Sequence, residues 1–594
     1  MKTLSWNTEK DANQTGGVYV IQKKWSIRTM ALPLLAAMLA LSACSTGGDS
    51  GSNEEPSVVS ESGESGNGDQ GKGAAEGPAV SPPGQYPIVA EKLKLKVFAP
   101  QYPSIEDMET NLYTKWIEEK TNIDLDFELA PNDALNERKQ LMMASGDYPE
   151  VILHGNLTKE EQMKYGQQGV FLPLNDLIEK YAPNVKKAME DIPYLKQSIT
   201  APDGNIYAIP QINECFHCTY AQKYWINEKW IEKVGLQMPT TPDELYTVLK
   251  AFKEKDPNGN GQADEIPLTG ATLETMWEGN IDGYLMAPFI YNDGTKYLMV
   301  KDGKVELAAN KDEWRQGLEY MNKLFSEGLI DKAAFTQNAD AVSQLANRDP
   351  NVLGSITTAL ISYAYSPDDK HPVHKEYATV PPLKGPNGVQ QAGYYGGVSN
   401  SQFAITNKAS ELQQAAAMRL VDLLFTEEAV ARQEFGPKDE KWREAQAGEL
   451  GLDGQPAKYA RITSDQPAPP THNDGWEQIG PSLRTAEYRA SWAVPQDPLA
   501  EGGYELRLYL ESKKYEPYKS TQVYPSSVFI DSKDASEAAQ LQTNIASYVR
   551  SNMAQFITGS KNIEKDWDAY VKGFEGLNAA RYLEIHQKAI DANQ

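Results

Sequence analysis

Residues 93–98 read Leu-Lys-Leu-Lys-Val-Phe, and residues 123–129 read Ile-Asp-Leu-Asp-Phe-Glu-Leu. Both stretches alternate apolar and polar side chains, which is the period of a strand with one buried face. Residues 106–121 and 134–144 instead carry apolar side chains at helical spacing, and a short apolar run at 148–154 predicts a third strand. Strands that alternate with helices predict an α/β fold with a mostly parallel sheet.

Two loops follow strands of this predicted sheet. Parallel α/β sheets bind ligands in the loops beyond the carboxyl ends of their strands. Residues 99–105 and 154–156 occupy such positions, which makes Tyr102, His154 and Asn156 polar candidates for ligand binding.

The rest of the chain continues the mixture of strands and helices, and its last third returns to long helices. It shows no internal repeat with a period of roughly 20–50 residues. The patterns predict strands at 206–210 and 402–405, and helices at 225–234, 242–255, 312–327, 411–425, 535–559 and 563–574.

The N-terminal part of the chain resembles a secretory signal. An apolar run at 30–43 follows a basic segment that ends at Arg28, and it closes with Leu41-Ser-Ala-Cys44. A Cys after Leu-Ser-Ala resembles a bacterial lipobox, which implies cleavage before Cys44 and attachment of lipid, such as palmitate, to that residue. We therefore interpret 1–43 as the signal peptide, with polar first residues that point to a start placed too far upstream. The alternative is a buried Cys at the end of a short core helix.

Residues 44–85 are mostly Gly, Ser, Glu and Pro. Such a segment cannot bury enough apolar surface to offset the entropy of ordering it, so we predict a disordered tether. A lipid on Cys44 and a tether would hold a soluble body at the outer face of the cell membrane, which is an extracytoplasmic location.

The composition limits the choice of partners. The chain of 594 residues has a net charge of −25, and its pI is about 4.8. Nucleic-acid binding needs a basic stripe, so the composition excludes nucleic-acid-binding proteins. We expect the protein to be a monomer. The same charge disfavours a strongly anionic ligand unless local Lys or Arg side chains compensate, so the sequence favours a neutral one.

Cys215 and Cys218 are the two cysteines besides Cys44. Outside the cytoplasm this pair can close a small disulfide, or it can remain as free thiols. A zinc site would need two more ligands, and His217 points away if the segment is extended. A redox-active pair would open a helix in a thioredoxin-like unit.

The loop at 256–267 has the spacing of the first half of an EF-hand. Oxygen-bearing side chains stand at positions 1, 3, 5 and 9, a Gly stands at position 6, and position 7 would offer its backbone carbonyl. Pro267 replaces the bidentate Glu of position 12, and Glu265 is the substitute carboxylate. The alternative is an ordinary polar turn. The candidate ligands of a structural calcium ion are Asp256, Asn258, Asn260, Gln262, Asp264 and Glu265.

Several segments together resemble extracellular solute-binding protein family 1. The likeness is to the large lipoproteins of oligosaccharide ABC importers from Paenibacillus-type bacteria, with alginate-oligosaccharide-binding proteins as relatives. It covers nearly all of the body. The segments that carry it are 223–236, 239–245, 256–267, 417–428, 476–484 and 563–570.

The resemblance implies a type II periplasmic-binding-protein fold, with two α/β lobes joined by crossover strands and extra C-terminal helices. It also implies that calcium occupies the 256–267 loop and that the ligand lies in the cleft. We expect the lobes to comprise 86–208 plus 388–447, and 209–387 plus 448–594.

Aromatic and polar side chains are the natural binding groups for a sugar, because a pyranose face is apolar enough to stack on Trp or Tyr. The alternative for each aromatic is a place in the core or on the surface. The candidates, in addition to Tyr102, His154 and Asn156, are Tyr224, Trp225, Trp277, Tyr394, Tyr395, Trp476, Arg484 and Trp492.

These observations favour a binding protein over an enzyme. The body contains no Gly-x-Ser-x-Gly elbow and the chain no His-Glu-x-x-His motif, although a glycosidase carboxylate pair is not excluded by counting. We expect a lipid-anchored receptor that captures an oligosaccharide and delivers it to an ABC permease. The alternatives are a surface enzyme that degrades polysaccharide, and a receptor for peptides or signals on the same fold.

Overall fold

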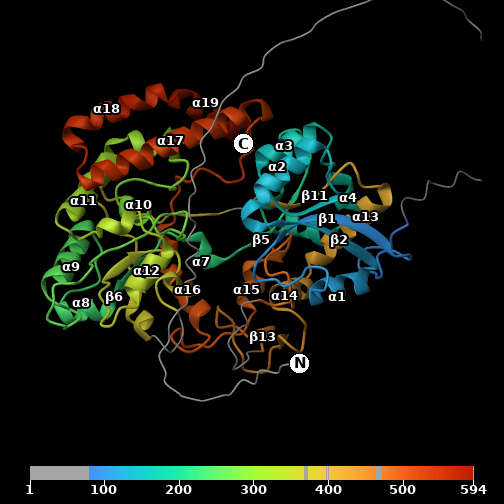
Figure 1. Cartoon of the computed structure of the whole chain (residues 1–594), viewed down its shortest axis with the longest axis horizontal. Coiled ribbons are helices and arrows are strands. Elements are labelled where there is room, and N and C mark those ends of the chain that lie inside the picture. The colour runs from blue at the N-terminus through green and yellow to red at the C-terminus, as the bar shows by residue number, and fades with distance from the viewer. Residues whose placement is uncertain (1–78, 367–371, 397, 399, 463–470, 593–594) are drawn as a thin grey trace, which may run out of the picture. The chain divides into compact units, whose positions relative to one another are not determined.

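The computed structural model describes residues 79–366, 372–396, 398, 400–462 and 471–592 (Figure 1). All of them belong to the unit formed by residues 74–594. Cys44 and most of the predicted tether lie outside the described residues, so both stay predictions. No helix in the described part of the chain is long and apolar enough to span a bilayer.

The first lobe is built on a five-stranded sheet with strand order β2-β1-β3-β11-β4. β1 runs parallel to β2 and β3, which confirms the expected parallel arrangement of these three strands. β11 comes from much later in the chain and runs antiparallel to both of its neighbours. The strands are β1 (Leu93–Gln101), β2 (Ile123–Pro131), β3 (Val151–Leu157), β4 (Ile209–Pro210) and β11 (Ser401–Ile405).

The helices of the first lobe begin where polar side chains cap them. Asn111 accepts a hydrogen bond from the Tyr113 backbone N–H, so α1 begins later than the predicted Glu106. Thr158 and Glu161 form a capping box at the start of α3. The helices are α1 (Leu112–Thr121), α2 (Leu135–Ser145), α3 (Lys159–Gln167), α4 (Asn175–Tyr181), α5 (Pro183–Asp191), α6 (Leu195–Ile199), α13 (Glu411–Leu424) and α14 (Glu427–Phe435).

The second lobe has a three-stranded sheet with strand order β10-β6-β9. The sequence predicts helix from Trp225, but Tyr224–Asn227 form strand β6, because Asn227 caps the helix that follows and accepts from the Trp230 N–H. The elements are β6, β9 (Ser355–Thr357), β10 (Tyr377–Thr379), α8 (Glu228–Val234), α9 (Pro242–Glu254), α10 (Ile281–Met286), α11 (Asp312–Ser326), α12 (Ala339–Ala346) and the hairpin β7 (Leu298–Lys301) and β8 (Lys304–Leu307).

The C-terminal helices belong to the core of the second lobe. α17 (Ser532–Thr558) packs along α11 and α19 (Ala579–Ala592), and α18 (Ile563–Gly576) also packs on α11. Figure 1 shows these three helices at the top, beside α11. Their buried faces join the same hydrophobic cluster as β6 and α9. The extra C-terminal helices expected from the resemblance are therefore present.

The chain crosses between the lobes more than once. It leaves the first sheet through β4, β5 (Ile212–Asn213) and the short helix α7 (Phe216–Thr219) before it enters β6. β5 pairs in parallel with β14 (Leu483–Arg484), which places two crossing segments side by side. The remaining elements near this crossing are β12 (Trp442–Glu444), β13 (Tyr459–Arg461), α15 (Ala486–Ala490) and α16 (Tyr504–Lys513).

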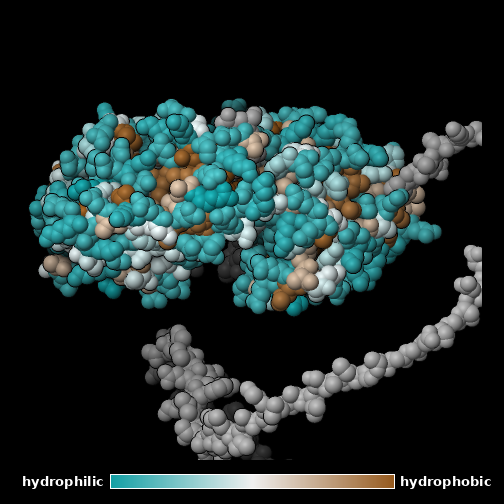
Figure 2. All heavy atoms as spheres, turned by 90° about the horizontal axis from the view of Figure 1, so that it is seen from above, coloured by the Kyte–Doolittle hydropathy of each residue, from teal (hydrophilic) through white to brown (hydrophobic). Residues whose placement is uncertain are grey.

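The surface of the described part is mostly hydrophilic, with small hydrophobic patches (Figure 2). This distribution agrees with the net charge of −25. The apolar residues of the first sheet lie in two buried clusters and those of the second sheet in two others, so the two sheets share no cluster. Each lobe therefore has its own core, and the space between the lobes can hold polar groups.

Candidate functional site

A cavity of about 600 Å³ opens where the crossing segments meet the second lobe. This main cavity falls in the size range of ordinary ligand clefts, roughly 300–1,000 Å³. Three of the predicted aromatic residues meet in it, although they are far apart in the sequence. The lining includes Trp277, Tyr394 and Tyr395 together with Gln211, Asn213, Cys218, Tyr291, Asp293, Lys296, Gln478 and Tyr524.

An adjoining cavity of about 420 Å³ shares Lys296, Val398, Tyr524 and Ser526 with the main cavity. We call it the lysine cavity. Its first-lobe wall is the start of α3, and its other wall comes from the second lobe and α19. The two cavities are therefore contiguous, and together they are walled by both lobes. Sequence reasoning missed the residues of the lysine cavity, because no local motif marks them.

Glu278 follows Trp277 and was not predicted. It has a positive φ of 54° and is 8% exposed, and both Tyr395 and Gln222 hydrogen-bond to its carboxyl group. Burial raises the pKa of Glu278 to about 7. Gln222 also donates to the Tyr395 hydroxyl at 3.0 Å. This network fixes the orientation of Tyr395 at the cavity wall.

Arg484 lies behind the wall of the main cavity and does not line it. Its side chain is 3% exposed, and its Nη2 donates to Gln478 Oε1 at 2.8 Å and to Gln211 Oε1 at 3.2 Å. Burial lowers the pKa of Arg484, and the nearby Glu434 carboxylate opposes that shift. Arg484 is thus a positioning residue for two glutamines that do line the cavity.

The predicted loop residues of the first sheet form a second polar group. The Tyr102 hydroxyl lies 3.0 Å from His154 Nε2, and the Gly480 backbone N–H donates to His154 Nδ1 at 2.9 Å. Burial lowers the pKa of His154 to about 4, so the ring is neutral at physiological pH. Asn156 accepts from Asn400, which lines the lysine cavity. These residues therefore lie behind the first-lobe wall.

Four predicted aromatics lie elsewhere. Tyr224 and Trp225 are fully buried in β6, and Trp476 is buried against Tyr113 in the core of the first lobe. No sugar ring can reach such a side chain, so these three are corrected to core residues. Trp492 lines a separate cavity of about 210 Å³ beside α15.

Cys215 and Cys218 form a disulfide across the start of α7. The segment is helical and not extended, so His217 turns toward the cysteines: its Nε2 lies 3.4 Å from Cys215 Sγ. The three residues are close enough together for a metal site, but a disulfide leaves no thiolate to bind an ion. The Cys215–Cys218 disulfide therefore constrains the segment that connects the two lobes, next to the main cavity.

The Asp256–Glu265 loop folds as its spacing requires. The Asp256 carboxylate accepts from the backbone N–H groups of Gly259, Asn260 and Gly261 at 2.9–3.1 Å. Gly259 and Gly261 have φ of 77° and 75°, which L side chains rarely adopt. These bonds turn the loop tightly on itself, and the Asn258 and Asn260 side-chain oxygens accept from the backbone N–H groups of Asn260 and Gln262.

The donor set of this loop fits a calcium ion. Glu265 Oε1 is buried without a hydrogen-bond partner among the described residues, and burial followed by the Asp256 and Asp264 charges raises the pKa of Glu265. The amides of Asn258 and Asn260 approach the Asp264 carboxylate at 3.1–3.2 Å. Carboxylates held this close, with one orphaned oxygen, are the environment that a hard cation stabilises.

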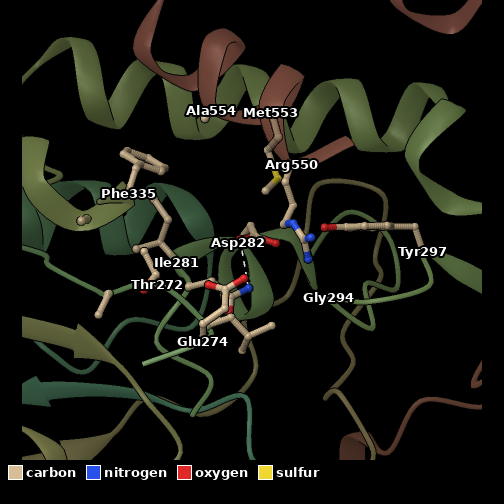
Figure 3. A pocket seen from close by; sticks show the side chains of 14 residues that line it. Thr272, Glu274, Ile281, Asp282, Gly294, Tyr297, Phe335, Arg550, Met553 and Ala554 are labelled. Atoms are coloured by element: carbon tan, nitrogen blue, oxygen red, sulfur yellow. Dashed lines mark hydrogen bonds between the residues drawn. The ribbon is translucent and has the colours of Figure 1, made fainter. Parts of the chain in front are cut away.

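A further pocket of about 150 Å³ lies between the 271–297 loops and α17. Arg550 reaches from α17 toward Asp282 and Tyr297, while Phe335 and Met553 supply apolar surface (Figure 3). Asn280 and Asn292 donate hydrogen bonds to the Asp282 carboxylate. This pocket is too small for an oligosaccharide, so the cavities between the lobes are the candidate site.

Solved structures with a similar fold include substrate-binding proteins in complex with sugars. Fructooligosaccharide-binding FusA of Streptococcus pneumoniae in complex with kestose matches with a TM-score of 0.67 and 28% identity, over 84% of this chain and 99% of that one. A structure of its EF-hand mutant with fructo-nystose matches equally well. Alginate-binding protein AlgQ2 without calcium matches in fold, with a TM-score of 0.61 and 24% identity over 85% of this chain and 99% of that one.

The sequence comparisons agree. The model of the bacterial extracellular solute-binding protein family matches residues 102–431. The fructooligosaccharide ABC transporter substrate-binding protein FusA of Streptococcus pneumoniae serotype 4 is 30% identical over 516 residues, which are 85% of this chain and 91% of that protein. The chain belongs to the bacterial extracellular solute-binding protein family.

Proposed function

We propose that the chain is the lipid-anchored, extracytoplasmic solute-binding subunit of a carbohydrate ABC transporter. The observation that carries this proposal is the pair of contiguous cavities walled by both lobes of a family member, with Trp277, Tyr394 and Tyr395 in the lining. Aromatic faces stack on pyranose or furanose rings, and the neighbouring amides and hydroxyls hydrogen-bond to sugar hydroxyls. FusA, which is described with kestose, supports an oligosaccharide as the ligand.

Capture follows from the two-lobed design. The lobes close on the ligand by bending at the crossing segments, where β5 pairs with β14. The closed form then presents both lobes to the permease, which releases the ligand into its channel. Leu41-Ser-Ala-Cys44 supports a lipid at Cys44 that keeps the protein beside that permease.

Calcium has a structural role in this proposal. The loop connects α9 to the segment 266–269, which forms bridges with Leu353 of the strand region around β9 and with Ile330. An ion held by the six loop residues would neutralise their carboxylates and fix this connection inside the second lobe. The EF-hand mutant of FusA supports a related loop in that protein.

Binding without turnover tests the proposal. The purified chain is titrated with neutral and acidic oligosaccharides while intrinsic fluorescence, solution scattering and product formation are followed. We expect a fluorescence change, a smaller radius on closure and no product. Products that disappear in a single carboxylate variant would show the rival enzyme instead, and binding of peptides in place of sugars would show a different receptor.

A further inference from the structure

Two lysines face the lysine cavity from opposite lobes. Lys159 is the first residue of α3 in the first lobe, and Lys296 precedes β7 in the second lobe. Lys296 also lines the main cavity. The two ammonium groups are near enough that the charge of Lys296 contributes to lowering the pKa of Lys159, after the larger effect of burial. One cation thus stands on each side of the gap.

Neither lysine makes an ion pair with any residue in the described part of the chain. Lys159 Nζ donates to the Ser198 carbonyl at 2.5 Å and lies 4.0 Å from the centre of the Phe529 ring. Lys296 Nζ lies 5.2 Å from the centre of the Tyr524 ring. These contacts give each ammonium group a carbonyl or ring partner, but within the described residues neither lysine forms an ion pair, although Glu160 lies near Lys159 and Asp293 near Lys296.

Lys139 shows what this protein does with a buried lysine that has only a structural role. Its side chain is 2% exposed, and it pairs with Glu161 at 2.8 Å and donates to the Gly155 carbonyl. A buried charge is normally neutralised in this way, because an unpaired one loses its hydration without compensation. Lys159 and Lys296 are half-buried, and in an acidic chain with 82 Asp and Glu against 57 Lys and Arg, two such lysines without an ion pair in one cavity need a separate reason.

His586 supplies a third polar group to the same cavity. It is 2% exposed, its Nδ1 lies 2.8 Å from the Tyr524 hydroxyl, and its Nε2 has no hydrogen-bond partner among the described residues. Burial, with a smaller effect of Lys296, lowers the pKa of His586 to about 3, so the ring is neutral. When the Tyr524 hydroxyl donates to Nδ1, the proton lies on Nε2 and that nitrogen is a donor without an acceptor.

The only carboxylate in the lining of this cavity is Glu160. Two ammonium groups and an unsatisfied imidazole therefore face one carboxylate, and the excess of charge is positive. The overall pI favours a neutral ligand, but a neutral ligand would form no ion pair with these two lysines. An anionic substituent would form charge-assisted hydrogen bonds with them.

We propose that the lysine cavity binds an anionic substituent, a carboxylate or a sulfate, on the captured oligosaccharide, between Lys159 and Lys296. The inference rests on the proposed function and names the ligand class for that site. An anion between the two ammonium groups replaces their mutual repulsion with two attractions that link the lobes. Charge recognition thereby favours the closed form.

The test compares anionic and neutral ligands in one variant series. Titration calorimetry measures the affinity of the full chain for trigalacturonate, for a sulfated tetrasaccharide and for neutral kestose. Lys296→Gln is the main variant, because Lys296 has no side-chain hydrogen bond to lose within the described residues. Lys159→Gln is the second, and Lys304→Gln, an exposed lysine on β8, is the matched control. Melting temperatures check that each variant is folded.

We expect tighter binding of at least one anionic probe than of kestose, and a loss of roughly 10- to 100-fold for that probe in Lys296→Gln, as for a charge-assisted hydrogen bond. That loss should shrink at high salt, and Lys304→Gln should show none. If the chain binds kestose more tightly than both anionic probes, and Lys296→Gln leaves the kestose affinity unchanged, the anionic subsite is overturned. The proposal that the chain binds an oligosaccharide would still stand. Failure of every oligosaccharide to bind overturns both proposals.

Discussion

The Asp256–Glu265 loop and the cavities between the lobes are both polar, but they are built in opposite ways. The loop takes its oxygens from consecutive residues, and backbone hydrogen bonds to Asp256 hold them in one turn. The cavities take their groups from segments as distant as Lys159 and His586. A contiguous site depends on local turn geometry, whereas an assembled site depends on the placement of two lobes. Calcium should therefore act mainly on stability, and changes in the cavities mainly on ligand affinity.

Removal of calcium should have the largest effect. An ion that binds only the folded chain stabilises it by about 4 kcal/mol at a thousandfold excess over its Kd. We expect the melting temperature to rise with calcium after chelation, and the rise to vanish in Asp256→Ala with Asp264→Ala. Glu254→Ala, exposed at the end of α9, is the control. If the melting temperature of the wild-type protein does not change with calcium concentration, the loop does not hold a structural calcium ion.

Glu278 should give the next largest effect, on the pH dependence of stability. Its pKa is raised in the folded state to about 7, mainly by burial, so the folded chain holds a proton that the unfolded chain has lost. Stability contributed by this group is present below about pH 4.5 and is lost as pH rises to about 7, by at most ~3 kcal/mol. Denaturant unfolding across this range should show a smaller loss in Glu278→Gln. If the free energy of unfolding changes with pH equally in the wild type and in Glu278→Gln, Glu278 is not protonated in the folded chain.

Trp277→Ala should weaken oligosaccharide binding by about 2 kcal/mol, the scale of a lost stacking contact. Its calcium-dependent rise in melting temperature should remain that of wild type, because the loop is separate from the cavity. Titration calorimetry measures the first effect and thermal unfolding the second. Trp116→Ala, on α1 and outside both cavity linings, controls for the loss of a tryptophan. Equal affinities in the two variants would remove Trp277 from the site.

Arg484→Met should have the smallest effect on affinity, about 1 kcal/mol, because it removes hydrogen bonds that only orient Gln211 and Gln478. The side chain does not line the cavity, so the loss should appear as a faster release of ligand, measured by stopped-flow fluorescence. Arg484→Lys should restore part of it. A complete loss of binding in a folded Arg484→Met protein would mean that Arg484 contacts the ligand itself.

The features that could be predicted were local in the sequence. Alternation at 93–98 and 123–129 gave β1 and β2, and apolar spacing gave α9, α11 and α18 nearly to the residue. The loop spacing around Gly261 predicted a tight turn, and backbone N–H groups that donate to the Asp256 carboxylate form it. In each case the deciding interactions join residues a few positions apart, so the pattern carries the information.

The features that could not be predicted depend on tertiary placement. Trp225 and Trp277 carry the same side chain, yet one is buried in a strand and the other lines the main cavity. The sequence around Lys159 and Lys296 shows no motif, because what sets these lysines apart is that neither forms an ion pair in the described part of the chain, although Glu160 and Asp293 lie near them. Only the packed lobes reveal which aromatic or charged residues face the gap.

The insertion of β11 between β3 and β4 has a consequence for the order in which the chain can fold. A polypeptide that leaves a ribosome or an export channel N-terminus first presents β1 to β4 long before Ser401–Ile405. Until that segment arrives, β3 and β4 have no partner between them and the first sheet cannot close. Such non-local pairing slows folding, so β3 and β4 stay incompletely paired until most of the chain has been made.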